Sequence, residues 1–152
     1  MAMYFNDLSP YSYFLKRPLE TVVNVGWLDA TQPFYVAPVA EGVLRKLADI
    51  CRSRAPVLAH VNKLRSVVAC PICGRDRFDA VDPAGKLLVG MTELWIPNPK
   101  GGYFAAPSLV VHHIAEHGYS PPQSFQDAIS AFDLTLPYDA QAVYLKSIAG
   151  AF

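Results

Sequence analysis

The feature that most constrains this sequence is a pair of cysteines followed, further along the chain, by a cluster of histidines. The stretch ACPICGR carries Cys70 and Cys73, and the stretch LVVHHIAEHGY carries three of the four histidines. Zinc sites commonly combine C-x2–4-C with H-x3–5-H, because two thiolates and two imidazoles complete a tetrahedral coordination sphere. We therefore expect the two stretches to meet at one Zn²⁺, with Cys70 and Cys73 as the sulfur ligands.

The spacing of the histidines leaves the choice of nitrogen ligands open. His112 and His117 are separated by four residues and His113 and His117 by three, so either pair satisfies the spacing. Residues at i and i+4 share a helix face, which slightly favours His113 with His117. The pair of His112 and His117 requires the second histidine to lie at the frayed end of the helix, which Gly118 allows.

Two catalytic uses of the same residues compete with a structural zinc site. A redox C-x-x-C pair should begin a helix, but the residues after Cys73, GRDRFDAVDPAGK, are polar and contain glycine and proline. The segment His113–His117 also matches the H-x-x-E-H motif of zinc hydrolases, in which Glu116 would be the base. A hydrolase needs a further ligand downstream and leaves the cysteine pair without a role. Four ligands fill a tetrahedral site, so we predict a structural Zn²⁺, no catalytic residue and no enzyme activity.

The rest of the chain predicts an α+β fold. Thirteen prolines divide it into short elements. Alternating or β-branched runs indicate strands, NPKGG indicates a hairpin turn, and apolar stripes at helical spacing indicate helices. We expect a small antiparallel sheet with three to four helices and a zinc-ribbon-like or treble-clef-like Cys2His2 site. The predicted strands are 21–28, 33–38, 63–70, 87–97 and 103–107, and the predicted helices begin at Pro38, at Pro107, at Ser120 in a capping box with Gln123, and after Asp139.

Length and composition fit one domain. With 152 residues, of which 52% are hydrophobic, the chain can bury a core without disulfides. We expect a single zinc-stabilised domain over residues 1–152, with a zinc-binding core at 62–132 and a C-terminal tail helix at 133–152. Cys51 is expected to be a buried core thiol, and His60 a histidine at the surface or the core edge. The start of the chain lacks the layout of a signal peptide and no apolar run could span a bilayer, so we expect a cytoplasmic protein without membrane contact.

Charge and aromatic content indicate two kinds of partner. The net charge is zero, yet residues 45–77 contain eight basic and two acidic residues, which is compatible with nucleic-acid binding. Protein–protein contact fits three features better. They are the zero net charge, a closed metal site and a content of eight Tyr, eight Phe and two Trp. We expect a protein partner, with nucleic acid as the second hypothesis.

Several stretches resemble a family of small, uncharacterised bacterial proteins. They are YFNDLSPYSY, NVGWLDATQPF, ACPICG and YFAAPSLVVHHIAEHGYSPPQSFQDAI. The family combines DLSPYxY, NVGWL and CxxC motifs with a closing segment of the type APxLIxHYxxxHxYxPPxxF. The resemblance covers roughly Tyr4 to Ile129, and the closing segment is its most specific part.

The resemblance implies both a ligand set and a function. Its first histidine falls on His112, its tyrosine on His113 and its second histidine on His117, so the implied metal ligands are Cys70, Cys73, His112 and His117. Its members are similar to accessory proteins of bacterial gene clusters, including clusters for toxins and their immunity proteins. The resemblance therefore implies an immunity protein, or antitoxin, that binds and neutralises a cognate toxin. This chain departs from the pattern in its longer middle and in the tail after Phe132.

Overall fold

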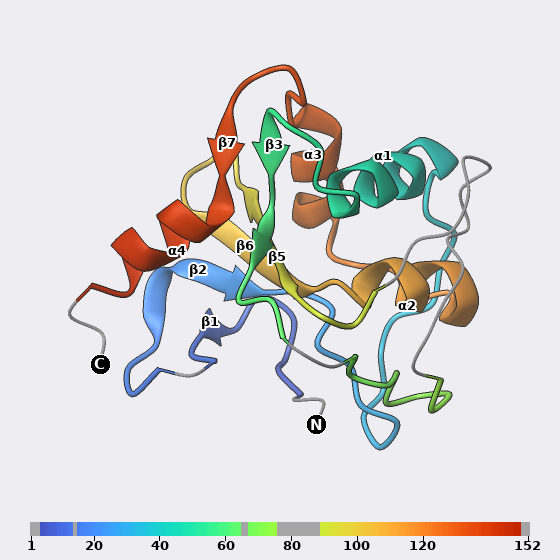
Figure 1. The fold of residues 1–152 in the computed structure, drawn as a ribbon. Helices are drawn as coiled ribbons and strands as arrows, with labels where there is room; N and C mark the ends of the chain where they lie inside the picture. Colours follow the sequence, from blue (N-terminus) through green and yellow to red (C-terminus); the bar gives the residue numbers. More distant parts are fainter. Residues whose placement is uncertain (1–3, 14, 65–66, 76–88, 150–152) are drawn as a thin grey trace.

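The computed structural model describes residues 4–13, 15–64, 67–75 and 89–149 and has an α+β architecture (Figure 1). Its main sheet has five strands in the order β1-β2-β6-β5-β4. The pair of β2 and β6 is parallel, and the other three pairs are antiparallel. The strands are β1 (Pro10–Tyr11), β2 (Leu19–Asn24), β4 (His60–Val61), β5 (Glu93–Pro97) and β6 (Tyr103–Pro107).

Four helices and a smaller sheet surround this sheet in the described part of the chain. The smaller sheet pairs β3 (Val57–Leu58) with β7 (Tyr138–Asp139) in parallel. The first helix packs against the second and the third, and the last packs against β4 and β5 at the other end of the molecule (Figure 1). They are α1 (Glu41–Cys51), α2 (Val110–His117), α3 (Gln123–Ala131) and α4 (Ala140–Ser147).

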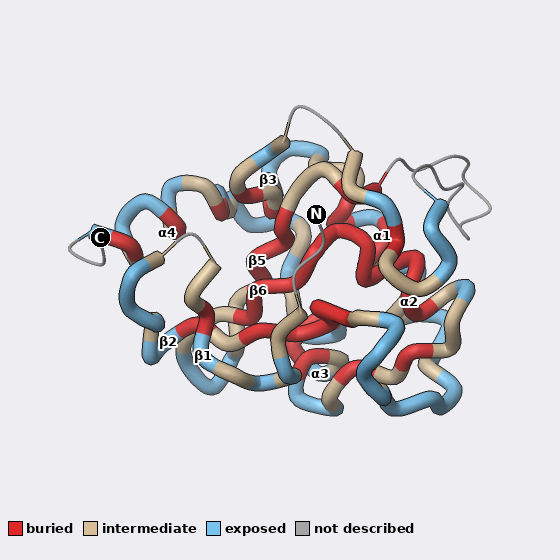
Figure 2. The backbone as a smooth tube through the Cα atoms, turned by 90° about the horizontal axis from the view of Figure 1, so that it is seen from below, coloured by how far each residue is buried: buried red, intermediate tan, exposed pale blue. Residues whose placement is uncertain are grey.

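Both faces of β5 are buried, whereas β2 includes exposed residues. Leu94 and Ile96 of β5 join an apolar cluster with α1, α2 and α3, whereas Trp95 joins a second cluster with α4. Successive side chains of a strand point to opposite faces, so β5 reads as a continuous apolar run rather than an alternating one. Buried backbone accordingly passes through the centre of the molecule along β5 and β6 (Figure 2).

The N-terminal segment is attached to the end of β2 by side chains. Asp7 Oδ1 accepts a hydrogen bond from the Gly26 N–H at 2.9 Å, and its Oδ2 accepts one from the Tyr119 hydroxyl at 2.7 Å. Asn24, which is fully buried, donates through Nδ2 to Ser9 Oγ and to the Pro10 carbonyl, each at 3.1 Å. The stretches DLSPY and NVGW are therefore held together by hydrogen bonds, and Tyr119 links them to the end of α2.

The hairpin agrees with the sequence prediction, but the histidine helix begins at Val110 rather than at Pro107, which ends β6. Other elements also differ from the prediction. The return strand occupies residues 103–107 as predicted. The sheet is mixed rather than antiparallel, because β2 and β6 are joined by a long connection that returns the chain in the same direction. Residues 33–38 form only an isolated bridge between Val36 and Tyr119. The predicted strand over 87–97 begins only at Glu93, and its first two residues lie outside the described part.

The predicted strand over 63–70 is absent from its described residues, 63–64 and 67–70. Two separate hydrogen bonds, from Leu64 N to Met91 O at 2.6 Å and from Val68 N to Gly90 O at 2.7 Å, hold this segment beside the chain before β5. Gly90 has a φ of +99°, and a Cβ there would lie 2.6 Å from the Val68 carbonyl oxygen. This left-handed residue interrupts extended backbone, so no regular ladder forms.

The capping box predicted for the third helix is wrong. Pro122 is the N-cap of α3, no side-chain hydrogen bond caps the helix, and Gln123 Nε2 donates instead to Asp127 Oδ1 at 2.8 Å. The Ser120 N–H donates to the Tyr35 carbonyl at 2.9 Å. The two prolines that follow Ser120 delay the helix start by fixing extended backbone. The final helix does begin after Asp139, which accepts a hydrogen bond from the Ala142 N–H at 3.2 Å.

Substitution of Gly102 by alanine is expected to destabilise the hairpin strongly. Gly102 has a φ of +78°, and a Cβ there would lie 2.2 Å from the Thr21 carbonyl oxygen on the neighbouring strand. We expect a loss of about 2 kcal/mol or more in the free energy of unfolding, measured by urea denaturation. Gly101→Ala is the matched control, because Gly101 also has a positive φ of +114° but no atom within 4 Å of the added carbon. Equal losses for the two variants would contradict the steric explanation.

Among the described residues, no helix combines the length and the apolar character that crossing a membrane requires.

Candidate metal centre

The cysteine pair lies in a tight turn that is closed by backbone hydrogen bonds. The Gly74 N–H donates to the Cys70 carbonyl and the Cys70 N–H donates to the Arg75 carbonyl, each at 2.8 Å. The Ile72 N–H points to Cys70 Sγ at 3.4 Å. Gly74 has a φ of +74°, the left-handed conformation that closes the turn. Cys70 is buried and Cys73 is exposed, so the turn presents one sulfur to the core and one near solvent.

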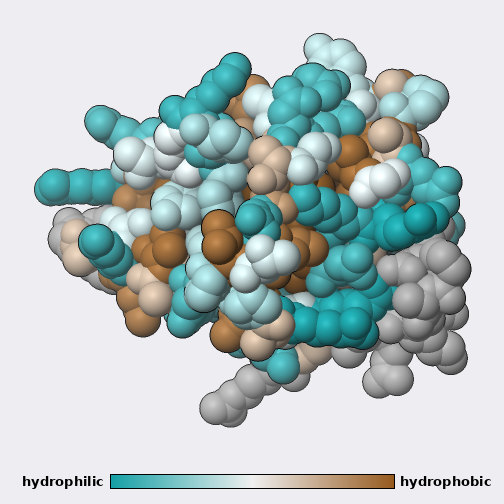
Figure 3. All heavy atoms as spheres, turned by 90° about the horizontal axis from the view of Figure 1, so that it is seen from above, coloured by the Kyte–Doolittle hydropathy of each residue, from teal (hydrophilic) through white to brown (hydrophobic). Residues whose placement is uncertain are grey.

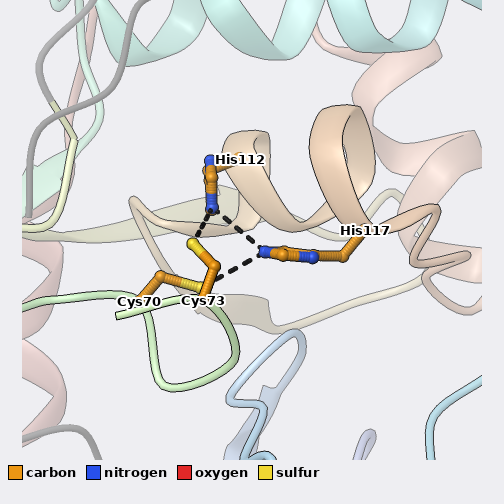
Figure 4. Close-up of side chains that lie close together, drawn as sticks. All are labelled: Cys70, Cys73, His112 and His117. Atoms are coloured by element: carbon orange, nitrogen blue, oxygen red, sulfur yellow. Dashed lines mark hydrogen bonds between the residues drawn. The ribbon is translucent and has the colours of Figure 1, made fainter. Parts of the chain in front are cut away.

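Helix α2 supplies the nitrogen atoms. Pro107 ends the hairpin, the helix begins three residues later, and Gly118 ends it with a φ of 66°. His112 is 4% exposed, while His117 is half-buried at the last helical position. The helix therefore places both imidazoles on the side that faces the cysteine turn (Figure 4).

The four side chains converge at distances typical of a shared metal ion. Cys73 Sγ lies 3.4 Å from His112 Nε2, Cys70 Sγ lies 3.5 Å from His117 Nε2, and the two Nε2 atoms are 3.2 Å apart (Figure 4). All four ligand atoms lie within 4.8 Å of one another. Tetrahedral Zn–S bonds of about 2.3 Å and Zn–N bonds of about 2.0 Å separate sulfur from nitrogen by about 3.5 Å and two nitrogens by about 3.3 Å. The four residues are thus positioned to hold a metal ion.

Burial favours the neutral form of the two imidazoles in the centre of α2. Burial, with His117 as a second cause, lowers the pKa of His112 to about 4. Burial likewise lowers the pKa of His113 to about 3. Neutral imidazoles are the forms that coordinate metals. Burial raises the pKa of the Cys70 thiol, and a cation beside it would stabilise its thiolate.

His113 lies beside the four-residue cluster rather than in it. Its side chain is 1% exposed, and its Nδ1 is 3.9 Å from Cys70 Sγ, a hydrogen-bonding distance for sulfur. Glu116 is exposed on the outer side of α2. The geometry therefore pairs His112 with His117. Helix spacing alone had favoured this pair less than His113 with His117. The cysteine turn lies against both ends of α2, so the ligands need not share one face of the helix.

Two substitutions on α2 distinguish a ligand from its neighbour. His112→Ala is expected to remove tight metal binding, whereas His113→Tyr, the residue that the resemblance places there, is expected to keep one metal ion per chain. The measurement is metal content by elemental analysis after dialysis against a weak chelator. A metal ion retained by His112→Ala and lost by His113→Tyr would reverse the assignment.

The other two singled-out residues are structural. Cys51 is 4% exposed in the core, and burial raises the pKa of its thiol to about 12. His60 is half-buried, and its Nε2 donates to the Cys51 carbonyl at 2.7 Å while its Nδ1 accepts from the Thr92 hydroxyl. Burial lowers the pKa of His60. Both residues lie at the junction of α1 and β4, as a core thiol and a core-edge histidine.

Sequence reasoning missed a buried carboxylate. Glu93 is 4% exposed, and its Oε1 accepts hydrogen bonds from the Tyr11 hydroxyl at 2.7 Å and from Trp95 Nε1 at 3.3 Å. Its Oε2 accepts one from Asn62 Nδ2 at 2.9 Å. Burial raises the pKa of Glu93. A single acidic residue at the start of the apolar run ELWIP was the only signal in the sequence.

The fold and the site define an α+β protein with a Cys2His2 cluster that can hold a metal ion. The family model described as Domain of unknown function (DUF7919) matches residues 3–130, and the chain belongs to this family. No curated protein and no solved structure matches the chain.

Proposed function

We propose that Cys70, Cys73, His112 and His117 bind one structural Zn²⁺ in a treble-clef-like arrangement. The cysteine turn, the β5–β6 hairpin and α2 follow one another along the chain, as in such sites. The two Nε2 atoms that face each other at 3.2 Å support the proposal, because two neutral imidazole acceptors at this distance need a cation or a proton between them. Two sulfurs and two nitrogens complete a closed coordination sphere, so the ion stabilises the fold and leaves no position for a substrate.

We further propose that the protein is non-catalytic and acts by binding another protein. The observation that carries this proposal is an exposed aromatic segment beside a groove. Tyr35 is 83% exposed and Val36 is 68% exposed, so two large side chains adjacent in the chain lie open to solvent. The groove has a volume of about 560 Å³ and includes Phe5, Leu28 and Phe34 among its described lining residues. Exposed tyrosines next to apolar grooves are typical centres of protein interfaces.

The surface seen from above is less suited to such a contact. Apolar side chains occur there in small patches among hydrophilic ones (Figure 3). The elements β3 and β7 lie at this side in Figure 1, and the exposed apolar residues in and beside them are Leu58, 43% exposed, and Leu136, 59% exposed. Scattered leucines of this kind are ordinary on protein surfaces.

The resemblance to accessory proteins of toxin clusters supports a particular partner. We propose that the chain is a bacterial immunity protein that binds and neutralises a cognate toxin. The test is co-expression with the toxin-type product of a neighbouring gene, followed by co-purification and by a survival assay. Tyr35→Ala is expected to weaken the complex at least tenfold, while Leu145→Ala, a control at a 57% exposed position on α4, should leave it unchanged. Equal affinity of both variants, or no complex, would contradict the proposal.

Nucleic-acid binding by the basic segment is the alternative. Two of its arginines are already paired, Arg45 with Glu41 at 2.6 Å and Arg52 with Asp49 at 2.8 Å, which lowers the positive charge available to phosphates. Retention on heparin with a steep salt dependence would favour this alternative, and elution at low salt would exclude it.

A further inference from the structure

A small cavity lies between the buried carboxylate of Glu93 and the segments that carry the metal cluster. Its volume is about 50 Å³. Its walls are mostly apolar, with Trp27 and Leu64 among them, while Glu93 and Asn62 form a polar end and His113 contributes from α2. Tyr13, Asn62 and Leu64 are only half-buried, so they form the side from which a ligand can enter.

The polar end of this cavity is a buried carboxyl group with no cation beside it among the described residues. Within the described ranges, the two ion pairs are Arg45 with Glu41 and Arg52 with Asp49, so Glu93 has no cationic partner there. Its Oε1 accepts two hydrogen bonds, but its Oε2 accepts only the one from Asn62. A carboxylate oxygen can accept a further bond, and a buried carboxylate without a cation is costly. Burial raises the pKa of Glu93, so a positively charged donor bound at Oε2 would offset the cost of burying the ionised carboxylate.

We propose that this cavity binds a small ammonium group, with Glu93 as its counter-ion and Oε2 as the hydrogen-bond acceptor. The apolar walls would contact the carbon atoms attached to the nitrogen. A water-sized group occupies roughly 10–15 Å³ on this scale, so the cavity accommodates about three or four non-hydrogen atoms. Ethylammonium fits this size, and so does the end of a lysine side chain. None of the four metal ligands lines this cavity, which shares only Leu28 among its described lining residues with the groove beside Tyr35.

Tryptophan fluorescence provides a direct test on the full-length, zinc-loaded protein in phosphate buffer. Trp27 lines the cavity, and Trp95 donates a hydrogen bond to Glu93, so an occupant should change the emission. We expect a saturable change with ethylammonium chloride in the millimolar range, which is the affinity that so few atoms allow. Ethanol, which has the same number of non-hydrogen atoms and no charge, and sodium chloride at equal ionic strength should give no saturable change.

Two variants connect the signal to the cavity. Glu93→Gln keeps the shape and two acceptor bonds but removes the charge, and it should weaken ethylammonium binding at least tenfold. Leu64→Phe fills the cavity from its half-buried side while leaving Glu93 intact, and it should block binding even if Glu93→Gln proves too unstable to measure.

N-acetyl-lysine methylamide distinguishes the source of the ammonium group. Binding at least as tight as that of ethylammonium indicates a protein side chain, and weaker binding indicates a free amine. Equal responses to ethylammonium and ethanol, or full binding by Leu64→Phe, would overturn the proposal.

Discussion

Replacement of Cys73 by serine is expected to remove tight zinc binding and to destabilise the whole fold. The Cys73 side chain is exposed, and substitutions at exposed positions usually change stability by no more than about 0.5 kcal/mol. A ligand behaves differently, because structural zinc binding contributes directly to the free energy of folding. At a zinc concentration of about a thousand times the dissociation constant, the bound ion adds about 4 kcal/mol, and its loss should lower the melting temperature by about 10 °C.

The measurement is thermal unfolding with and without a strong chelator. The wild-type protein should be destabilised by the chelator, and Cys73→Ser should be unaffected by it. Cys51→Ala is the matched control: it removes a buried thiol outside the cluster, so it should cost some stability and still respond to the chelator. A Cys73→Ser protein as stable as the wild type would show that the cysteine turn carries no ion.

Replacement of Asp7 by alanine is the second large effect that we expect. The carboxylate holds the Gly26 N–H and the hydroxyl of Tyr119, a side chain that is fully buried. Without it, the tyrosine hydroxyl has lost its acceptor, and an unsatisfied buried polar group costs about 1–3 kcal/mol. With the second hydrogen bond also removed, the free energy of unfolding should fall by about 3 kcal/mol in urea denaturation.

Two further variants test the cause of that loss. Asp29→Ala also removes two hydrogen bonds, those from Thr31 N and Thr31 Oγ1, but in an exposed turn, so its effect should be much smaller. Tyr119→Phe removes the hydroxyl, and the double variant with Asp7→Ala should lose less than the sum of the two single losses. Strict additivity would mean that the two side chains do not stabilise each other.

Local sequence signals predicted the elements that depend on local chemistry. The turn NPKGG, the strand over 103–107 and the helix end at Gly118 each depend on residues close in the chain, and the structure has all three. The mixed strand order could not be predicted, because pairing between β2 and β6 depends on the path of a long connection. Two consecutive prolines and one left-handed glycine were enough to displace the expected starts of α3 and β5.

The metal cluster was predictable in its residue types from spacing, and in all its members only through the family resemblance. Spacing rules allowed His112 or His113, the resemblance implied His112, and the position of the cysteine turn relative to α2 agrees with His112. Glu93 was not predictable as a buried group, because its partners Tyr11 and Asn62 come from distant segments. Burial is decided by tertiary packing, which a one-dimensional pattern of polar and apolar residues specifies only in part.

X-ray absorption spectroscopy at the zinc edge, combined with the metal content of the purified protein, tests the coordination directly. One zinc per chain is predicted, with two sulfur atoms at about 2.3 Å and two nitrogen atoms at about 2.0 Å. The account would be contradicted if protein produced in zinc-containing medium carried no bound ion. It would also be contradicted if the coordination shell of the ion lacked sulfur.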